Sequence, residues 1–436
     1  FSDVSCKNGE CYHTKVAYSD DDGKTWHINQ VEPIENTPRI FPGGQRRHWF
    51  NNGCEPTVVE LKDGTLRLGL RSSGPHHAFC ISKDGGKTWS KAEPDTAFWA
   101  TNTMPLFFRL SDGRLLFFWN NTAILPTMPI SAHPEVAKKS TITKGIWEAV
   151  FTNRDALHAA ISDDDGKTWK GFREIALNDI RNRCDFRTCG IDNAARNDKS
   201  VHQSQAIELA EGKVLLAFGQ NKSARRMIVF DPDWLLEKGR VENFDKGLDA
   251  ISHHLYVKSY AGSWGKNGHC SWNRIPGAVL SRDPDHSLEK TVVREALQIC
   301  RIADPRLFDD RQGVTWNFPA AAAGSVELEC RIEGAGFRLS LLDHWINPCD
   351  SFNAERAPFS QAISSDLLPK GKWAKLAVVW DIQKQDAELF IDGKSIARTK
   401  LKDCPRFGLS YLHLQSLAET HDPDGSYFRS FRQRSR

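Results

Sequence analysis

The sequence has no hydrophobic run that approaches the roughly 20 apolar residues of a transmembrane helix. It also has no large excess of charge, since its formal net charge is +3 over 436 residues and Lys and Arg are interspersed with Asp and Glu. The electrostatic footprint of nucleic-acid binding is therefore missing. We expect no membrane span and no nucleic-acid partner, and we expect the basic end, Phe428 to Arg436, to be a solvated tail.

The cysteines do not form a metal-binding pattern. There are 11 of them, an odd number, and no Cys-x-x-Cys pair is present, so we expect no metal site and no cofactor. Two close pairs, Cys6/Cys11 and Cys184/Cys189, lie in loop-like segments. A disulfide could close a small ring at each pair in an oxidising compartment, and reduced thiols are the alternative.

Three segments of the sequence repeat one pattern, Ser-x-Asp-x-Gly-x-Thr-Trp. They are Tyr18–Trp26, Ile81–Trp89 and Ile161–Trp169, and their Trp residues lie 63 and 80 residues apart. The Ser and Asp side chains can hold the N–H groups of a turn, Gly accepts a positive φ, and Trp can fold back onto a sheet. Each segment therefore predicts a hairpin turn, and we expect its acids to be structural and not catalytic.

A second hairpin signal alternates with the first. Paired apolar runs surround the turns Asp63-Gly64, Asp112-Gly113 and Glu211-Gly212. Two hairpins together make one four-stranded blade, so the alternation predicts a β-propeller. The segment Met227–Trp234 is expected to be the outer part of a further blade with a degenerate repeat.

The alternation of the two hairpin patterns ends at about Asp249. The segments Ser325–Ile332 and Trp373–Asp381 and the hairpin around Asp392-Gly393 are typical of an antiparallel β-sandwich. We therefore expect an all-β chain, with propeller blades over residues 1–249 and a linker and sandwich over residues 250–436. The sandwich resembles concanavalin-like and laminin-G-like modules.

The repeated turns resemble the Asp-boxes, or BNR repeats, of the sialidase (neuraminidase) superfamily. The segment Asn52–Arg71 resembles the sialidase segment in which a catalytic Glu opens a blade and an Arg ends its second strand, which implies these roles for Glu55 and Arg71. Arg154 precedes the strand that leads into the third Asp-box, as the last arginine of the carboxylate-binding triad does in that family. Guanidinium groups suit the task because they bind carboxylates bidentately and stay charged.

The sequence departs from the family at the nucleophile. Retaining sialidases use a Tyr that stands just before the first strand of the final blade, but no Tyr occurs between Tyr18 and Tyr256. His202 and Gln203 occupy the expected place, and we expect both in the substrate pocket.

The first triad arginine and the acid/base Asp of the family are also not found. The sequence opens at Phe1 without a Met or a signal-peptide pattern, and only 54 residues precede Glu55. We expect that N-terminal blades are missing from this sequence. The alternative is a smaller propeller closed by residues after Asp249.

Histidines offer further candidates for the site. His48, on a polar and aromatic loop just before Glu55, could act as general acid or base, and a structural loop histidine is the alternative. His76 and His77 follow Arg71 on a Gly-Pro turn, and we expect His77 to contact substrate.

The leading hypothesis is an exo-acting glycosidase that removes a terminal acidic sugar, sialic acid first, from a glycan or glycoconjugate. A uronate-directed lyase on the same scaffold and a non-catalytic carbohydrate-binding protein are the alternatives. The resemblance implies a secreted or periplasmic protein.

Overall fold

The structure is a computed structural model. It describes residues 2–3, 13–32, 34, 53–72, 74–123, 154–177, 200–219, 225–260, 272–285, 294–307 and 309–436. The chain divides into two compact units that change over at Leu235/Leu236. Both units consist of antiparallel sheets, so the predicted all-β class is confirmed.

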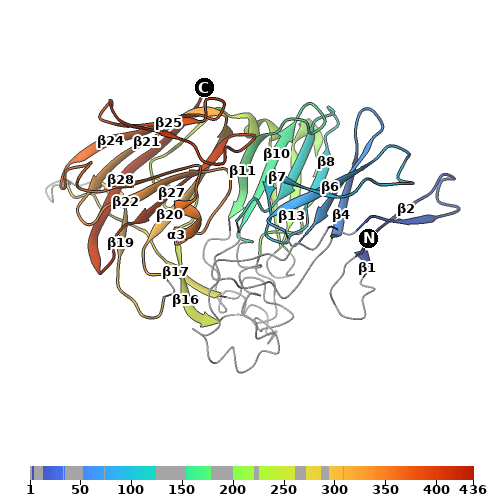
Figure 1. Cartoon of the computed structure of the whole chain (residues 1–436). Helices are drawn as coiled ribbons and strands as arrows, with labels where there is room; N and C mark the ends of the chain where they lie inside the picture. Colours follow the sequence, from blue (N-terminus) through green and yellow to red (C-terminus); the bar gives the residue numbers. More distant parts are fainter. Residues whose placement is uncertain are drawn as a thin grey trace. The chain divides into compact units, whose positions relative to one another are not determined.

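Within the described residues, the N-terminal unit contains four antiparallel blades in chain order (Figure 1). Blade 1 has the strand order β1-β2-β3, blade 2 β4-β5-β6-β7, blade 3 β11-β10-β9-β8 and blade 4 β12-β13-β14. The strands are β1 (Ser2–Asp3), β2 (His13–Tyr18), β3 (His27–Gln30), β4 (Cys54–Glu60), β5 (Leu66–Arg71), β6 (His76–Ser82), β7 (Glu93–Trp99), β8 (Leu106–Arg109), β9 (Leu115–Trp119), β10 (Ala156–Ser162), β11 (Lys170–Leu177), β12 (Gln205–Glu208), β13 (Val214–Phe218) and β14 (Arg226–Phe230).

The predicted hairpins are present in these blades. Strands β4 and β5 turn at Asp63-Gly64, with Glu60 opposite Leu66, and β8 and β9 turn at Asp112-Gly113. Strands β12 and β13 turn through the short 3₁₀ helix η4 (Ala210–Gly212). The alternation of apolar residues therefore predicted the strands correctly.

The three repeated turns share one hydrogen-bond pattern. In the third, Thr168 N–H donates to Asp164 Oδ1 at 2.8 Å and Gly166 N–H donates to Ser162 Oγ at 2.8 Å. The indole of Trp169 donates to Gly166 O at 3.0 Å. The first and second turns repeat these bonds. The acids of these turns are thus engaged in holding the backbone, as predicted.

Each repeated turn from blade 2 onward contacts the blade before it. Asn29 of blade 1 donates to Gly86 O of blade 2 at 3.3 Å, and Arg67 of blade 2 donates to Gly166 O of blade 3 at 3.2 Å. The degenerate turn of blade 4, within the 3₁₀ helix η5 (Pro232–Leu236), places Trp234 under the Arg173 guanidinium of blade 3, 3.6 Å from the ring centroid. The repeats therefore join successive blades.

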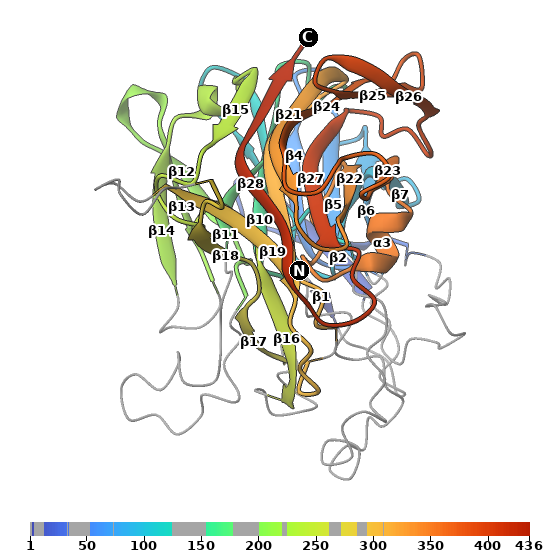
Figure 2. The same cartoon turned by 90° about the vertical axis from the view of Figure 1, so that its left-hand side faces the viewer.

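The C-terminal unit is a two-layer β-sandwich (Figure 2). Its large sheet has the order β18-β19-β28-β21-β24-β25-β26, with β15 also pairing with β28, and its small sheet has the order β20-β27-β22-β23. The elements are β15 (Gly239–Glu242), β16 (His254–Tyr260), β17 (Trp272–Pro276), β18 (Val279–Arg282), β19 (Glu295–Arg301), β20 (Gly313–Ala321), β21 (Ala323–Ile332), β22 (Phe337–Leu342), α3 (Ser351–Glu355), β23 (Phe359–Ile363), β24 (Trp373–Asp381), β25 (Asp386–Ile391), β26 (Lys394–Lys400), β27 (Leu409–Ser416) and β28 (Asp422–Ser435).

One apolar core lies between the two sheets. Alternate residues of the small sheet, such as Trp316, Leu339 and Leu412, face Val326 and Leu376 of the large sheet in a single buried cluster. Alternation with a period of two sends the intervening residues of the small sheet to its other face.

That other face of the small sheet carries polar side chains bonded to the chain itself. Thr315 donates to Ile346 O at 2.9 Å, Ser340 to Ala354 O at 2.8 Å and Ser410 to Asp343 O at 3.1 Å. His413 lies with its Nε2 3.0 Å from Pro348 O. We call residues 343–354 the covering segment, because its carbonyl groups satisfy this polar face.

Two expectations about the C-terminal unit differ from the structure. The basic end is not a solvated tail, because β28 is an inner strand of the large sheet, in which Phe428 and Phe431 are fully buried. The rhythm of the sequence changes near Asp249, but β15 at Gly239–Glu242 already pairs with β28. This pairing joins residues almost 200 positions apart, and local patterns do not report such contacts.

Three general features concern the described residues only. Their six cysteines, at positions 54, 80, 300, 330, 349 and 404, are free thiols, and both close cysteine pairs considered above lie outside the described residues. No group of three His, Cys, Asp or Glu side chains within the described part could hold a metal ion. None of the described helices is long and apolar enough to cross a membrane.

Candidate active site

Three residues with strained backbones mark one end of blades 2, 3 and 4. Glu55 is the second residue of β4, Asn102 lies four residues before β8, and Gln203 lies two residues before β12. Their φ angles are +42°, +54° and +60°. Side-chain-bearing residues rarely adopt positive φ, and such strain concentrates at functional sites. The same position, the entry to the first strand of a blade, is thus strained in three successive blades.

Strand pairing brings Glu55 and Arg71 together. Arg71 ends β5 directly opposite Cys54, and an irregularity in the register follows between Cys54 and Thr57. Arg71 Nη1 donates to Glu55 Oε2 at 2.6 Å. The Arg71 side chain is 8% exposed and that of Glu55 is 35% exposed, so the carboxylate is the part of this pair that solvent reaches.

Asn102 connects Arg71 to Arg154. Its side-chain oxygen Oδ1 accepts a hydrogen bond from Arg71 Nε at 3.0 Å, and its main-chain oxygen accepts one from Arg154 Nη2. Asn102 is 1% exposed and Arg154, which precedes β10, is fully buried. One residue therefore contacts both guanidinium groups.

His202 and Gln203 complete the group from blade 4. Arg154 Nη1 lies 3.3 Å from His202 Nε2, and Gln203 Nε2 donates to Glu55 Oε2 at 3.3 Å. A guanidinium is a donor at every relevant pH, so His202 Nε2 must be the acceptor in this contact. The geometry therefore assigns His202 as the neutral tautomer with its proton on Nδ1.

Opposing influences act on the pKa of Glu55. Burial raises the pKa of this carboxyl group, but the charge and hydrogen bond of Arg71, together with the charge of Arg154, lower it further than burial raises it. The net pKa lies below the usual value for Glu. Glu55 is therefore an anion at neutral pH.

The side chains connected by these contacts carry a net positive charge. Arg71 and Arg154 contribute two fixed charges, Glu55 contributes one negative charge, and Asn102, Gln203 and the neutral His202 contribute none. Charged groups in a partly dry site act more strongly than in water. The arrangement can attract a carboxylate and place it beside an ionised glutamate.

The structure brings together five of the seven residues that the sequence suggested for the site. These are Glu55, Arg71, Arg154, His202 and Gln203. His48 lies outside the described residues.

His77 lies elsewhere, in the interior of blade 2. It is fully buried, its Nδ1 lies 3.2 Å from Leu70 O, and its ring packs edge-on against Phe117. Burial lowers its pKa to about 4, so it is neutral at pH 7. Its neighbour His76 is half-buried against Trp99, with ring centroids 4.6 Å apart. In this position His77 offers no exposed atom to a sugar.

Asn102 was missed by reasoning from the sequence. It stands in Thr101-Asn102-Thr103, between two strands and outside every motif. The one available signal was its residue type, because Asn is enriched several-fold at positive φ.

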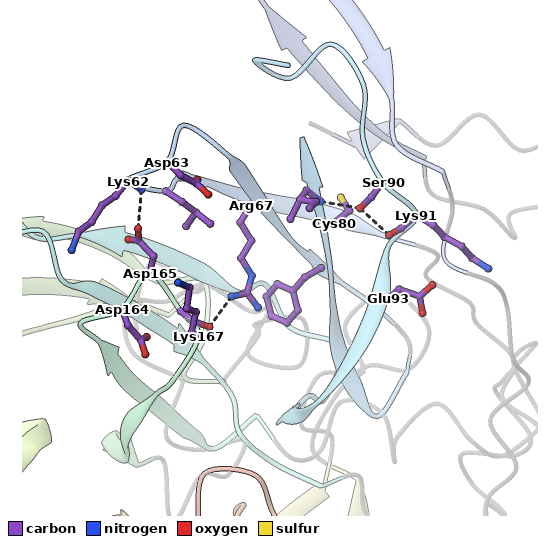
Figure 3. Close-up of a pocket in the computed structure, with 14 residues that line it drawn as sticks. Lys62, Asp63, Arg67, Cys80, Ser90, Lys91, Glu93, Asp164, Asp165 and Lys167 are labelled. Carbon is purple, nitrogen blue, oxygen red and sulfur yellow. Dashed lines mark hydrogen bonds between the residues drawn. The ribbon is translucent and has the colours of Figure 1, made fainter. Parts of the chain in front are cut away.

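A separate cavity of about 750 Å³ lies at the other end of blade 2 (Figure 3). Arg67, at the start of β5, projects into it, whereas Arg71 ends the same strand. Both acidic and basic side chains line this cavity. The Asp165 carboxylate accepts a hydrogen bond from the main-chain N–H of Lys62 at 2.8 Å, and the Arg67 guanidinium donates to Gly166 O. This cavity follows the junction between blades 2 and 3 and does not reach the group around Glu55.

Comparisons with known proteins bear on the blades. Residues 4–214 match the family model described as a BNR repeat-like domain. Among solved structures, Trypanosoma rangeli sialidase in complex with sialic acid is 13% identical, and the match covers 98% of this chain and 64% of that chain with a TM-score of 0.28. An intramolecular trans-sialidase from Ruminococcus gnavus, in complex with oseltamivir carboxylate, is 19% identical, with coverage of 51% and 38% and a TM-score of 0.30.

The chain thus spans less than two thirds of the length of the Trypanosoma enzyme that it matches. TM-scores this low do not establish a common arrangement over the whole chain. The family match over the blades and their repeated turns agree with each other. Residues 4–214 of this chain are therefore similar to a BNR repeat-like domain.

Proposed function

We propose that this protein is an exo-acting glycoside hydrolase that removes a terminal acidic sugar, sialic acid first, from a glycan or glycoconjugate. The observation that carries the proposal is the pair Arg71 and Arg154, linked through Asn102, with Glu55 held against Arg71. Two guanidinium forks next to one carboxylate suit a substrate that carries a carboxylate near the bond to be broken.

The proposed roles follow from the contacts. Arg71 and Arg154 bind the carboxylate of the sugar. Glu55, which is ionised and 35% exposed, accepts a proton. Arg71 also lowers the basicity of Glu55, so a substrate carboxylate that draws Arg71 away would restore part of that basicity.

Gln203 determines the type of reaction that we propose. Its amide donates to Glu55 and has no nucleophilic oxygen of the kind that a phenol offers. We therefore propose direct attack by water with inversion. Glu55 takes a proton from the water, the water oxygen bonds to the anomeric carbon, and the glycosidic oxygen leaves with a proton from a second acid. His48 is the sequence candidate for that acid.

A non-catalytic carbohydrate-binding protein is the second candidate. One observation favours it: a glutamate whose pKa is lowered by an ion pair is a weak base, and its other neighbour, Gln203, cannot act as a nucleophile. In that case the same arginines would bind the acidic sugar without turnover.

A fluorogenic α-sialoside tests the proposal. We expect turnover by the natural protein, and we expect Arg71→Ala and Arg154→Ala to lower kcat/KM at least roughly thirtyfold each, because each removes a positive charge that binds the substrate carboxylate. Arg398→Ala is the matched control, since Arg398 lies in the sandwich, is 65% exposed and forms an ion pair with Asp386 at 2.9 Å.

Proton NMR of the first-formed sugar anomer then identifies the stereochemistry. The inverted anomer supports water attack, and the retained anomer refutes it. Absence of turnover, with sialic acid binding that Arg71→Ala abolishes, would establish the binding protein instead. Absence of both turnover and binding would refute both candidates.

A further inference from the structure

Asn102 belongs to none of the sequence motifs, yet it contacts both arginines of the site. It belongs to the turn that leads into β8 and is 1% exposed. Its φ of +54° is a conformation that few residue types with a side chain adopt. A buried, strained, polar residue at this place requires an explanation.

The two oxygens of Asn102 serve different arginines. Oδ1 accepts from Nε of Arg71, and the main-chain oxygen accepts from Nη2 of Arg154. The Nε bond fixes the plane of the Arg71 guanidinium, while Nη1 of the same group reaches Glu55 at 2.6 Å. Two bonds from one planar group define its orientation, because rotation about the last side-chain bond would break both.

We propose that Asn102 is a positioning residue that holds Arg71 and Arg154 in the orientation in which both face one ligand carboxylate. The part of this inference that concerns a carboxylate ligand rests on the proposed function. The part that concerns the orientation of Arg71 does not.

Asparagine suits this position better than its relatives. Glycine adopts the positive φ but has no acceptor for Arg71 Nε, and alanine lacks the acceptor and is strained at this φ. Aspartate tolerates the conformation and keeps the acceptor, but it adds a negative charge next to the arginines. Only asparagine combines a tolerated positive φ with a short, uncharged acceptor.

The first measurement follows the Arg71 Nε–H group directly. We assign its signal in ¹H–¹⁵N spectra of the full chain by its loss in Arg71→Lys, and then measure its exchange with water. We expect slow exchange in the natural protein and in Asn102→Asp, and at least tenfold faster exchange in Asn102→Gly. Equal exchange in Asn102→Gly and the natural protein would overturn the inference.

The second measurement compares N-acetylneuraminic acid with its methyl ester as ligands. We expect Asn102→Gly to weaken binding of the acid about tenfold, and binding of the ester at most twofold, because the ester does not need the paired guanidinium groups. Asn102→Asp should also weaken the acid selectively, through its added charge. Equal loss for acid and ester in both variants would mean a merely structural role and would overturn the inference.

The two measurements separate this inference from the proposed function. If the natural protein binds neither ligand, the proposed function fails, and the exchange of Arg71 Nε–H still decides whether Asn102 orients that arginine. If Asn102→Gly does not fold, Asn102→Asp provides the test: unchanged binding of the acid by this variant would overturn the inference.

Discussion

Glu55 is the residue whose charge state governs the site. Burial raises its pKa in the folded protein, but Arg71 and Arg154 lower it further, so the net pKa lies below the usual value for Glu. The stabilisation that accompanies this shift is complete above the pKa of Glu in the unfolded chain, and it is lost as the pH falls through the lower folded value. The carboxylate of Glu55 therefore stays ionised to a lower pH than that of an ordinary surface glutamate.

The charge of Glu55 has opposite effects on catalysis and on binding. We expect Glu55→Gln to lower hydrolysis about 10²- to 10⁴-fold, the usual contribution of a general base, while binding of the acidic sugar stays equal or becomes tighter. Binding does not weaken because the variant removes a negative charge next to Arg71.

Kinetics and titration calorimetry of Glu55→Gln check this expectation, with Glu388→Gln, a half-buried residue of β25 in the sandwich, as the control. In the natural protein the acid limb of the pH–rate profile should lie below the usual pKa of Glu. An acid limb at or above that value, or a loss of binding in Glu55→Gln, would contradict the assignment.

The sequence predicted some residues of the group around Glu55 but not the contacts of Asn102. The proximity of Glu55, Arg71 and Arg154 was predictable because their places relative to the strands and repeated turns match a family pattern, and that of Gln203 because it stands in the nucleophile's place. The link through Asn102 was not, because it depends on a positive φ and on contacts between residues 31 and 52 positions apart. Sequence spacing carries no signal for such bonds.

The repeated turns act at the level of the blade, and their Trp residues differ in environment. Trp169 is 3% exposed and packs against Phe98 of blade 2 and Phe107 of its own blade, at 5.9 Å and 6.4 Å between ring centroids. Trp26, which makes the same bond to its turn, is 62% exposed. The same motif therefore has a different packing environment in blades 1 and 3.

This difference predicts unequal losses of stability. We expect Trp169→Ala to lower the free energy of unfolding by about 3–5 kcal/mol, as for other buried Trp and Phe side chains. We expect Trp26→Ala to cost about 1 kcal/mol or less, because it removes one exposed hydrogen bond and little buried area. Urea denaturation followed by circular dichroism measures both, and equal losses would show that the turn's own bonds, and not contact with the neighbouring blade, dominate.

Local and distant pairings of strands differ in how well the sequence predicts them. Hairpins at Asp-Gly turns, such as β4–β5 and β25–β26, were predictable because the turn residues and the alternation lie within a dozen positions. The pairing of β15 with β28 was not, and the basic composition of the C-terminal end suggested a tail. Strand β28 places Phe428 and Phe431 in the core although they are three residues apart, because its register against β21 shifts between them. Strict alternation along the sequence does not predict that spacing.

At the scale of the whole molecule, two units could each bind a sugar. The propeller unit has the positively charged group around Glu55. In the sandwich, the polar face of the small sheet is engaged by the covering segment, whose carbonyl groups accept from Thr315, Ser340 and Ser410. A sugar on that face would have to replace these bonds.

We therefore predict that the acidic sugar binds through the propeller unit alone. The double variant Arg71→Ala/Arg154→Ala in the full chain should show no measurable binding of N-acetylneuraminic acid, because both charged groups that contact Asn102 are gone. Isothermal titration calorimetry on the full chain measures this, with Arg398→Ala as the control that keeps normal binding. Residual binding by the double variant with the affinity of the natural protein would place a second site elsewhere. In that case Thr315→Ala and Ser340→Ala, which remove two bonds to the covering segment, would be added to the double variant. Stronger residual binding would then mean that the second site is the polar face of the small sheet and that the covering segment competes with the sugar for it.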